Sequence, residues 1–339
     1  MLSTMFRRTR GSLLGGLIAC ALAAGCDESS SVSWHVVGRD HPSALLSVWG
    51  TSATDVYAVG ADRRDGLGPL VYHYDGNGWD RLSTGQAGTL WWVFGIPGSG
   101  VFMGGDGGMI LHYDGGAFTR MSTPSQDTVF GIWGETASDM WAVGGAQGGA
   151  SGGFAWRLVG TDWTAAPGFP SDIASSDVIW KISGKNANDA WMVGTRGRAV
   201  HWDGVALTSA STGIGESLFT VHADANRLVA VGGFGTGTIL ENDGAGWRDA
   251  SPDGAPPLIG TYLARGGGYA VGQEGVVFER DSGTWREVAL GIQIEQSFHS
   301  TWVDPDGGVW AVGGQVQTLP LVDGIMVYGG ASPPKEWVP

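Results

Sequence analysis

The chain of 339 residues is poor in cysteine, in basic side chains and in long apolar runs. Its only cysteines, Cys20 and Cys26, lie close to the N-terminus, so the rest of the chain cannot hold a disulfide framework. The 19 lysines and arginines are outnumbered by 33 acids, and a net charge of −14 disfavours binding to nucleic-acid phosphates. Helical periodicity is absent beyond the N-terminal segment, which excludes a helical bundle.

The N-terminal segment has the layout of an export signal. Three arginines, Arg7, Arg8 and Arg10, precede an apolar stretch over residues 12–24. At about 13 residues this stretch is shorter than the roughly 20 that cross a membrane as a helix, but it suits a secretory signal peptide.

The letters "LAAGC" at 22–26, which end this segment, resemble the lipobox of bacterial lipoproteins. The resemblance implies a lipoprotein signal peptide over 1–25, a lipidated Cys26 and a polar tether over 26–33. We therefore expect the protein in the bacterial cell envelope, on the periplasmic or outer-surface side, touching the membrane only through its lipid. The alternative is an ordinary signal peptide in which Cys26 is incidental.

Beyond residue 33 the sequence repeats one short phrase. "DVYAVG" at 55–60 returns as "DMWAVG" at 139–144 and "DAWMVG" at 189–194, with weaker copies elsewhere. The glycines that end the copies recur about every 40 residues, a period typical of β-propeller blades. They are Gly60, Gly105, Gly144, Gly194, Gly232, Gly272 and Gly313. An earlier glycine, preceded in most cases by an aromatic residue, keeps the same offset in four copies: Gly50, Gly95, Gly134 and Gly184.

Each phrase is followed by a hairpin signal, a β-rich run and an Asp-Gly-type turn, as in "LVYHYDGNGW" at 70–79. One unit thus contains four strands, which we call a to d in chain order. Seven units predict an all-β chain, a seven-bladed β-propeller of four-stranded antiparallel blades over residues 34–339. The aromatic residues of strand b are expected to pack between adjacent blades: Tyr57, Trp141, Trp191 and Trp310.

The ring of blades needs a closing strand. Residues 33–50 match residues 78–95, so the repeated region begins with a strand d ahead of its first strand a. We expect this N-terminal strand to close the outer edge of the last blade. "GIMVYGG" at 324–330, also assigned as a strand d, is the competing candidate, and pairing of both would give a fifth strand.

The repeats resemble those of several propeller families. Asp-Gly hairpins ending in tryptophan, such as "DSGTW" at 281–285, are similar to the Asp-box repeats of sialidase-like and photosystem-assembly-factor-like propellers. The phrase at 55–60 together with the hairpin at 70–79 also resembles tectonin-type repeats, which occur in carbohydrate-binding lectins. These resemblances imply the fold and leave the function open.

Catalytic and metal-binding patterns are not found. His73, His112 and His201 share one column of strand c, but equivalent positions in different blades are too far apart to bind one metal ion. We therefore expect these histidines to form hydrogen bonds between blades. The acids recur by column as turn residues, and "DPDGG" at 304–308 is interpreted as a turn. The sequence predicts no catalytic residue, no metal site and no cofactor.

The loops that join strands b to c and d to a vary in length, whereas the other turns are stereotyped, which favours recognition on the face that carries the variable loops. The candidate ligand-binding residues on that face are Arg63, Arg64, Phe169, Arg196, Arg198 and Phe234. Lys181 lies in a strand a, where side chains line the central channel of a propeller.

The function predicted from these patterns is a monomeric, non-catalytic binding scaffold for an envelope protein or glycan. An exported polysaccharide-active enzyme, a glycosidase or a lyase, is the alternative. An enzyme of that kind requires a cleft that brings together at least two titratable groups with shifted pKa values.

Overall fold

The structure is a computed structural model that describes residues 32–146, 152–264 and 266–338. Contacts divide the chain into two units, Met1–Ser31 and Val32–Pro339. The signal peptide, Cys26 and the first residues of the tether therefore lie outside the described residues.

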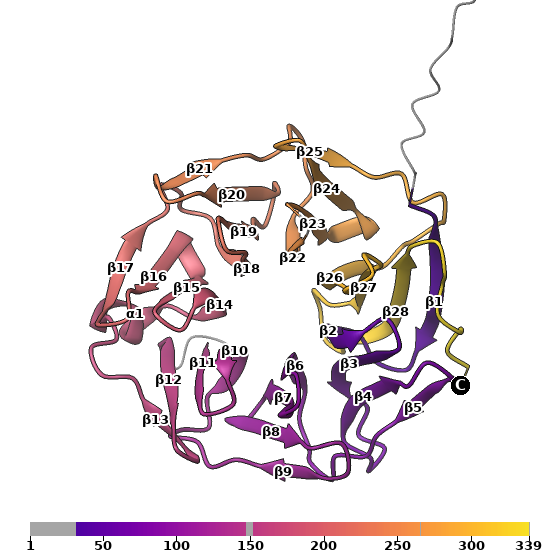
Figure 1. Cartoon of the computed structure of the whole chain (residues 1–339), viewed down its shortest axis with the longest axis horizontal. Helices are drawn as coiled ribbons and strands as arrows, with labels where there is room; N and C mark the ends of the chain where they lie inside the picture. Colours follow the sequence, from indigo (N-terminus) through magenta and orange to yellow (C-terminus); the bar gives the residue numbers. More distant parts are fainter. Residues whose placement is uncertain (1–31, 147–151, 265, 339) are drawn as a thin grey trace, which may run out of the picture. The chain divides into compact units, whose positions relative to one another are not determined.

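Seven antiparallel sheets of four strands form a ring, which confirms the predicted seven-bladed β-propeller (Figure 1). Strands a lie nearest the axis: β2 (Leu45–Ser52), β6 (Leu90–Ile96), β10 (Thr128–Thr136), β14 (Ile179–Asn186), β18 (Leu218–Ala223), β22 (Leu258–Ala264) and β26 (Ser297–Val303). Strands b are β3 (Asp55–Asp62), β7 (Gly100–Gly105), β11 (Asp139–Gly145), β15 (Asp189–Gly194), β19 (Leu228–Gly232), β23 (Gly267–Gly272) and β27 (Val309–Gln315).

The two outer strands of each blade complete the sheets. Strands c are β4 (Pro69–Tyr74), β8 (Met109–Tyr113), β12 (Phe154–Val159), β16 (Arg198–Trp202), β20 (Thr238–Asn242), β24 (Val277–Asp281) and β28 (Val322–Gly329). Strands d are β5 (Trp79–Arg81), β9 (Phe118–Arg120), β13 (Asp162–Ala165), β17 (Leu207–Ser211), β21 (Trp247–Asp249), β25 (Thr284–Glu287) and β1 (Trp34–His41). We number the blades 1 to 7 in the order of their strands a.

The N-terminal strand β1 closes blade 7, as predicted. It pairs antiparallel with β28, so that the sheet runs in the order β1, β28, β27, β26. The competing assignment of 324–330 as a strand d is wrong, because this segment pairs with β27 on one side and β1 on the other and is strand c. In blade 7, β1 thus covers the sheet edge of β28 that would otherwise be open.

The C-terminal tail adds a second closure between blades 7 and 1. The backbone N–H of Trp337 donates to the carbonyl of Val37 in β1 (2.7 Å), and its ring packs on His41. On the other side, the indole of Trp79 in β5 donates to the carbonyl of Lys335 (3.0 Å). The tail thus links the closing strand to the first blade, next to the C label in Figure 1.

The predicted interblade packing is confirmed for all four aromatic residues of strand b. Tyr57 packs against residues of blade 2, Trp141 against blade 4, Trp191 against blade 5 and Trp310 against blade 1. A buried aromatic side chain removes roughly 150–250 Å² from water, which contributes several kcal/mol as an upper bound at about 25 cal/mol per Å².

The glycines at the end of strand a have a packing reason. A Cβ on Gly95 would overlap the indole of Trp49 from the preceding blade, and a Cβ on Gly184 would overlap the indole of Trp133. Gly50 stands in the same relation to Trp302, which links blade 7 to blade 1. Trp49, Trp133 and Trp302 therefore each need a glycine at this position of the next blade, which links three pairs of neighbouring blades.

The histidines of strand c bond within their own blades, so the prediction of bonds between blades is wrong for them. His73 contacts Asp55 and His201 contacts Asp189, both at 2.8 Å, and His112 donates to the carbonyl of Ser99 (2.7 Å). Strands b and c are neighbours in one sheet, so a cross-strand position brings each imidazole to a turn or strand start of the same blade.

Glu241 occupies the same column of strand c as these histidines, and it forms the hydrogen bonds between blades that they do not form. Its buried carboxylate accepts hydrogen bonds from Arg280 (2.6 Å) and from the indole of Trp285 (2.8 Å), both in blade 6. Burial alone would raise the pKa of Glu241, but these bonds and the nearby arginine charges lower it. The hydrogen bonds of Glu241 with Arg280 and Trp285 therefore join blades 5 and 6.

Candidate functional site

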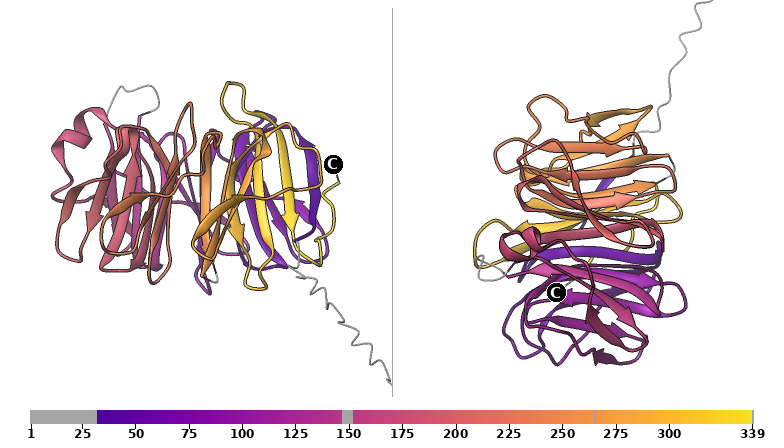
Figure 2. Two further views of the ribbon diagram at one scale, coloured as in Figure 1. Left: turned by 90° about the horizontal axis from the view of Figure 1, so that it is seen from above. Right: turned by 90° about the vertical axis from the view of Figure 1, so that its left-hand side faces the viewer.

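Two faces of the ring differ in what connects the strands. One face, which we call the loop face, carries the connections from strand b to c and from d to a, including helix α1 (Ser171–Ser176) and the turns η1 (Thr195–Gly197) and η2 (Gln273–Gly275). The other, the turn face, carries the a–b and c–d turns. In the left panel of Figure 2, α1 lies at the upper edge, which is the loop face. None of the helices in the described part of the chain has the length and apolar character to span a membrane.

All seven strands a carry a β-bulge near the loop face. In each of them the pairing with strand b skips one residue, the one that follows the first fully buried apolar residue of the strand. The skipped residues, which we call the collar, are Leu46, Trp91, Phe130, Trp180, Phe219, Ile259 and His299. A bulge re-aims a side chain and is a feature often found beside functional sites.

Ring contacts link five of the seven collar residues around the axis. Trp91 contacts Phe130 (centroids 5.5 Å apart), and Phe130 contacts Trp180 (4.7 Å). The series continues to Phe219, and Trp91 also approaches His299 of blade 7 across blade 1 (6.1 Å). The collar therefore contains a series of ring contacts from His299 to Phe219 at the loop-face end of the axis, in which Phe130 is buried.

Phe234 extends this surface into solvent. It lies in the b–c loop of blade 5, its ring meets Phe219 edge-on with centroids 5.2 Å apart, and 69% of it is exposed. Within the collar, Trp91, Trp180 and Ile259 are partly exposed, whereas Leu46 and Phe130 are buried. Phe234 is the predicted site residue that the structure joins to the collar.

Lys181 follows the collar residue Trp180 and is buried at the axis. Its Nζ donates to the carbonyl of Phe130 in blade 3 (2.8 Å) and lies 4.6 Å from the ring centroid of Trp92 in blade 2. Burial lowers the pKa of Lys181 to about 7.

His299 of blade 7 is an electrostatic neighbour of Lys181. Burial first, and then the charge of Lys181, lower the pKa of His299 to about 3, so its imidazole is neutral. Its Nδ1 donates to the carbonyl of Leu46 (2.5 Å).

Arg196 and Arg198 are bound by an internal carboxylate. Asp177, whose side chain is fully buried, contacts Arg196 (2.8 Å) and Arg198 (3.0 Å), and Thr195 donates to its other oxygen. Burial alone would raise the pKa of Asp177, but the hydrogen bonds from Arg196 and Thr195 and the two arginine charges lower it. These arginines therefore fasten the η1 turn to the d–a loop.

The remaining predicted residues lie apart from one another. Arg63 and Arg64 are exposed in the b–c loop of blade 1, away from the arginines of blade 4. No ion pair binds either guanidinium within the part of the chain that the structure describes. Phe169 is half-buried and packs against the core cluster that contains Ile173.

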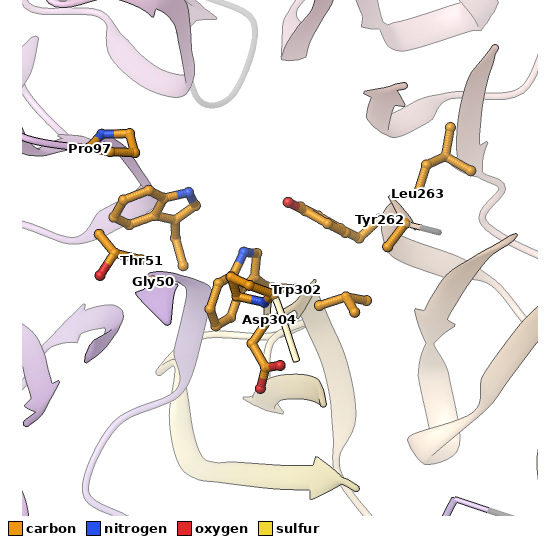
Figure 3. Close-up of a pocket in the computed structure, with 11 residues that line it drawn as sticks. Gly50, Thr51, Pro97, Tyr262, Leu263, Trp302 and Asp304 are labelled. Atoms are coloured by element: carbon orange, nitrogen blue, oxygen red, sulfur yellow. The ribbon is translucent and has the colours of Figure 1, made fainter. Parts of the chain in front are cut away.

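A pocket of about 390 Å³ opens at the turn-face end of the strands a. It is lined by residues of blades 1, 2, 6 and 7, among them Trp49, Thr51, Pro97, Tyr262 and Trp302. Figure 3 shows Tyr262 pointing its hydroxyl from the blade 6 side toward the side of Pro97 and Thr51.

The acid beside this pocket is used by its own turn. Asp304 is buried, and its carboxylate accepts from the backbone N–H groups of Asp306 (2.9 Å) and Gly308 (2.8 Å). The segment 304–308 is a turn, as predicted. Across residues 32–146, 152–264 and 266–338, no group of three or more His, Cys, Asp or Glu side chains could hold a metal ion.

The collar and the pocket were not predicted, although the sequence carries a signal for the collar. Its residues stand at a constant offset, four positions before Gly50, Gly95, Gly134 and Gly184 and at the matching positions of the other copies. The chemistry of this column varies from leucine to histidine, and only the bulge makes its members equivalent.

Comparisons with known proteins show the fold. No family model and no curated protein matches the chain. Among solved structures, YCF48 bound to D1 peptide is 13% identical with a TM-score of 0.66 and covers 90% of this chain and 99% of that chain. A streptogramin B lyase is 12% identical with a TM-score of 0.66, covering 88% and 98%. The WD40 repeats of RRP9 are 10% identical with a TM-score of 0.68, covering 88% and 98%. This fold thus occurs both in a peptide-bound protein and in an enzyme.

Proposed function

We propose that the protein is an exported, lipid-anchored, non-catalytic propeller that holds a partner protein of the cell envelope on its loop face. The observation that carries the proposal is the collar, seven bulged residues that surround the axis and continue into the exposed Phe234. Aromatic side chains that are partly exposed and rigidly held are the usual anchors of protein recognition.

The charged groups of the described residues favour binding over catalysis. The two buried carboxylates with lowered pKa values, Asp177 and Glu241, are both bound by arginines. A general base for polysaccharide cleavage needs a carboxylate free to reach its substrate. Arg63 and Arg64 remain proposed contacts for an anionic group of the partner.

Affinity capture with the full-length chain, tagged after Pro339 and solubilised in mild detergent, tests the partner. Phe234→Ser should reduce the yield of captured partner about tenfold, the loss of roughly 1.4 kcal/mol of contact. The matched control is Val205→Ser, because Val205 is 86% exposed but lies in a c–d turn on the turn face. Equal capture by both variants would contradict the proposed site.

The lipid anchor is tested by Cys26→Ser. The proposal requires the wild-type chain to incorporate radiolabelled palmitate and to sediment with membranes, and the variant to do neither. A variant that still sediments with membranes would show that another feature holds the chain there.

Binding of a neutral glycan is the second candidate, because the turn-face pocket combines the rings of Trp49 and Tyr262 with the hydroxyl of Thr51. A sugar ring has an apolar C–H face and polar edges, and a pocket of this size suits one or two rings. Saturation-transfer NMR with chitobiose, maltose and cellobiose tests it. Trp49→Phe should abolish transfer, whereas Trp133→Phe should not, since Trp133 packs on Gly184 as Trp49 packs on Gly95 but does not line the pocket.

A further inference from the structure

Lys181 differs from two other buried charges of the described chain, Asp177 and Glu241. Asp177 and Glu241 are each paired with arginines, whereas Lys181 has a backbone carbonyl and the face of an indole as its partners. Only 5% of Lys181 is exposed. A buried charge without a counter-ion is costly, and a protein with 33 acids has ample means to supply one. The position is therefore suited to a counter-ion that comes from outside the chain.

We propose that Lys181 binds a carboxylate of a peptide segment that enters the collar from the loop face. The inference rests on the proposed function, since it takes the collar as the recognition surface. The carboxylate would lie beside Nζ, which faces the indole of Trp92 and has neutral His299 as its electrostatic neighbour, and the low dielectric there strengthens an ion pair. Its source is either the C-terminus of the partner or an Asp or Glu side chain.

The groups around Lys181 favour a singly charged carboxylate. His299 is neutral and its Nδ1 is engaged by Leu46, so the site offers one ammonium and not a cluster of cations. A phosphate would need several donors to replace its hydration. The aromatic walls accept the apolar part of a peptide residue, and Phe234 lies where the segment would enter.

Binding must be coupled to a proton. The pKa of unliganded Lys181 is about 7, so near pH 8 most of the folded protein carries a neutral amine. A carboxylate beside Nζ stabilises the charged form and raises this pKa, and the complex therefore takes up a proton when it forms at pH 8.

The composition of the chain allows a direct measurement. It contains only three lysines, Lys181, Lys185 and Lys335. With ¹³Cε-labelled lysine in the full-length chain in detergent, NMR titration follows all three, and Lys185 and Lys335 are internal controls. The probes are N-acetyl-phenylalanine, its amide, and N-acetyl-glutamic acid α-amide, which present a C-terminal carboxylate, no carboxylate and a side-chain carboxylate.

N-acetyl-phenylalanine or the glutamic acid derivative should raise the pKa of Lys181 by about one pH unit, and the one with the larger effect identifies the source. The amide should leave it unchanged and bind about tenfold more weakly. If neither carboxylate probe moves the pKa of Lys181 at a concentration of roughly tens of millimolar, the inference is overturned.

Two variants separate this inference from the proposed function. Lys181→Met should lose the preference for the carboxylate probes, and Lys181→Arg, which keeps a cation, should retain most of it. If Lys181 responds to the probes but Phe234→Ser captures as much partner as the wild type, the proposed function fails and the carboxylate site remains. If capture depends on Phe234 but Lys181→Met keeps the carboxylate preference, the inference fails and the proposed function remains.

Discussion

The two ends of the axis are built by the same seven strands, yet they use aromatic side chains differently. At the turn-face end, Trp49, Trp133 and Trp302 lie on glycines of the next blade and hold the ring together. At the loop-face end, the collar residues stand at bulges, outside the pairing with strand b, and meet one another around the axis. The same seven strands therefore provide cohesion at one end and, at the other, the surface on which we propose recognition.

The largest expected effect breaks the cohesive end. Gly95→Ala should destabilise the fold by about 3 kcal/mol, because the new Cβ overlaps the indole of Trp49. Gly78→Ala is the matched control, since nothing lies within 4 Å of the Cβ position of Gly78. Urea denaturation measures both, and equal stabilities would show that the glycine register has another cause.

The second prediction concerns the arginines of the loop face. Asp177→Asn should cost about 2 kcal/mol, because it leaves Arg196 and Arg198 without their buried partner, although both are partly exposed. Asp172→Asn, which affects a carboxylate that is 55% exposed, should cost less than about 0.5 kcal/mol.

Acid denaturation provides a further check on Asp177. Its pKa is lowered, so its stabilisation is complete above the ordinary value of 3.8 and is lost as the pH falls through the folded-state value. The difference in free energy of unfolding between the wild type and Asp177→Asn should therefore become smaller as the pH falls below 3.8. A constant gap would argue against the ion pairs.

The third prediction concerns the cost of Lys181. Its pKa is about 7 when folded and 10.5 ordinarily, so the unfolded chain binds more protons at this site between these values. Burial of Lys181 therefore destabilises the wild-type protein most at low pH, and the free energy of unfolding rises with pH as this cost is lost. Lys181→Met should raise Tm by about 4 °C at pH 6, and this gain should shrink as the pH approaches 10. A gain that is independent of pH would place its origin elsewhere.

The smallest effect on stability is expected at Phe234, which is 69% exposed. Phe234→Ser should change the free energy of unfolding by less than about 0.5 kcal/mol while it weakens partner binding. A large loss of stability on urea denaturation would mean that Phe234 belongs to the core and not to the recognition surface.

The sequence predicts the ring because each blade repeats its local signals. The aromatic residues of strand b, the Asp-Gly hairpins and the extra N-terminal strand are all local patterns, and all led to the correct architecture. The assignment of 324–330 was wrong because strands c and d have similar composition. Only the register with β27 and β1 separates them.

The site was harder to predict because its residues become neighbours only through long-range geometry. Asp177 neutralises Arg196 and Arg198 from about 20 residues away, which the loop sequences do not reveal. Likewise, nothing local distinguishes Trp91 from Trp92, yet the bulge sends one into the collar and pairs the other with Gly104.

Photo-crosslinking in cells tests the central claim, recognition at the loop-face end of the axis, most directly. p-Benzoylphenylalanine would replace Phe234 in one full-length chain and Val205 in another, since both side chains are largely exposed but lie on opposite faces. The account predicts a discrete protein adduct from position 234 and none from position 205. An adduct from position 205 alone would contradict it.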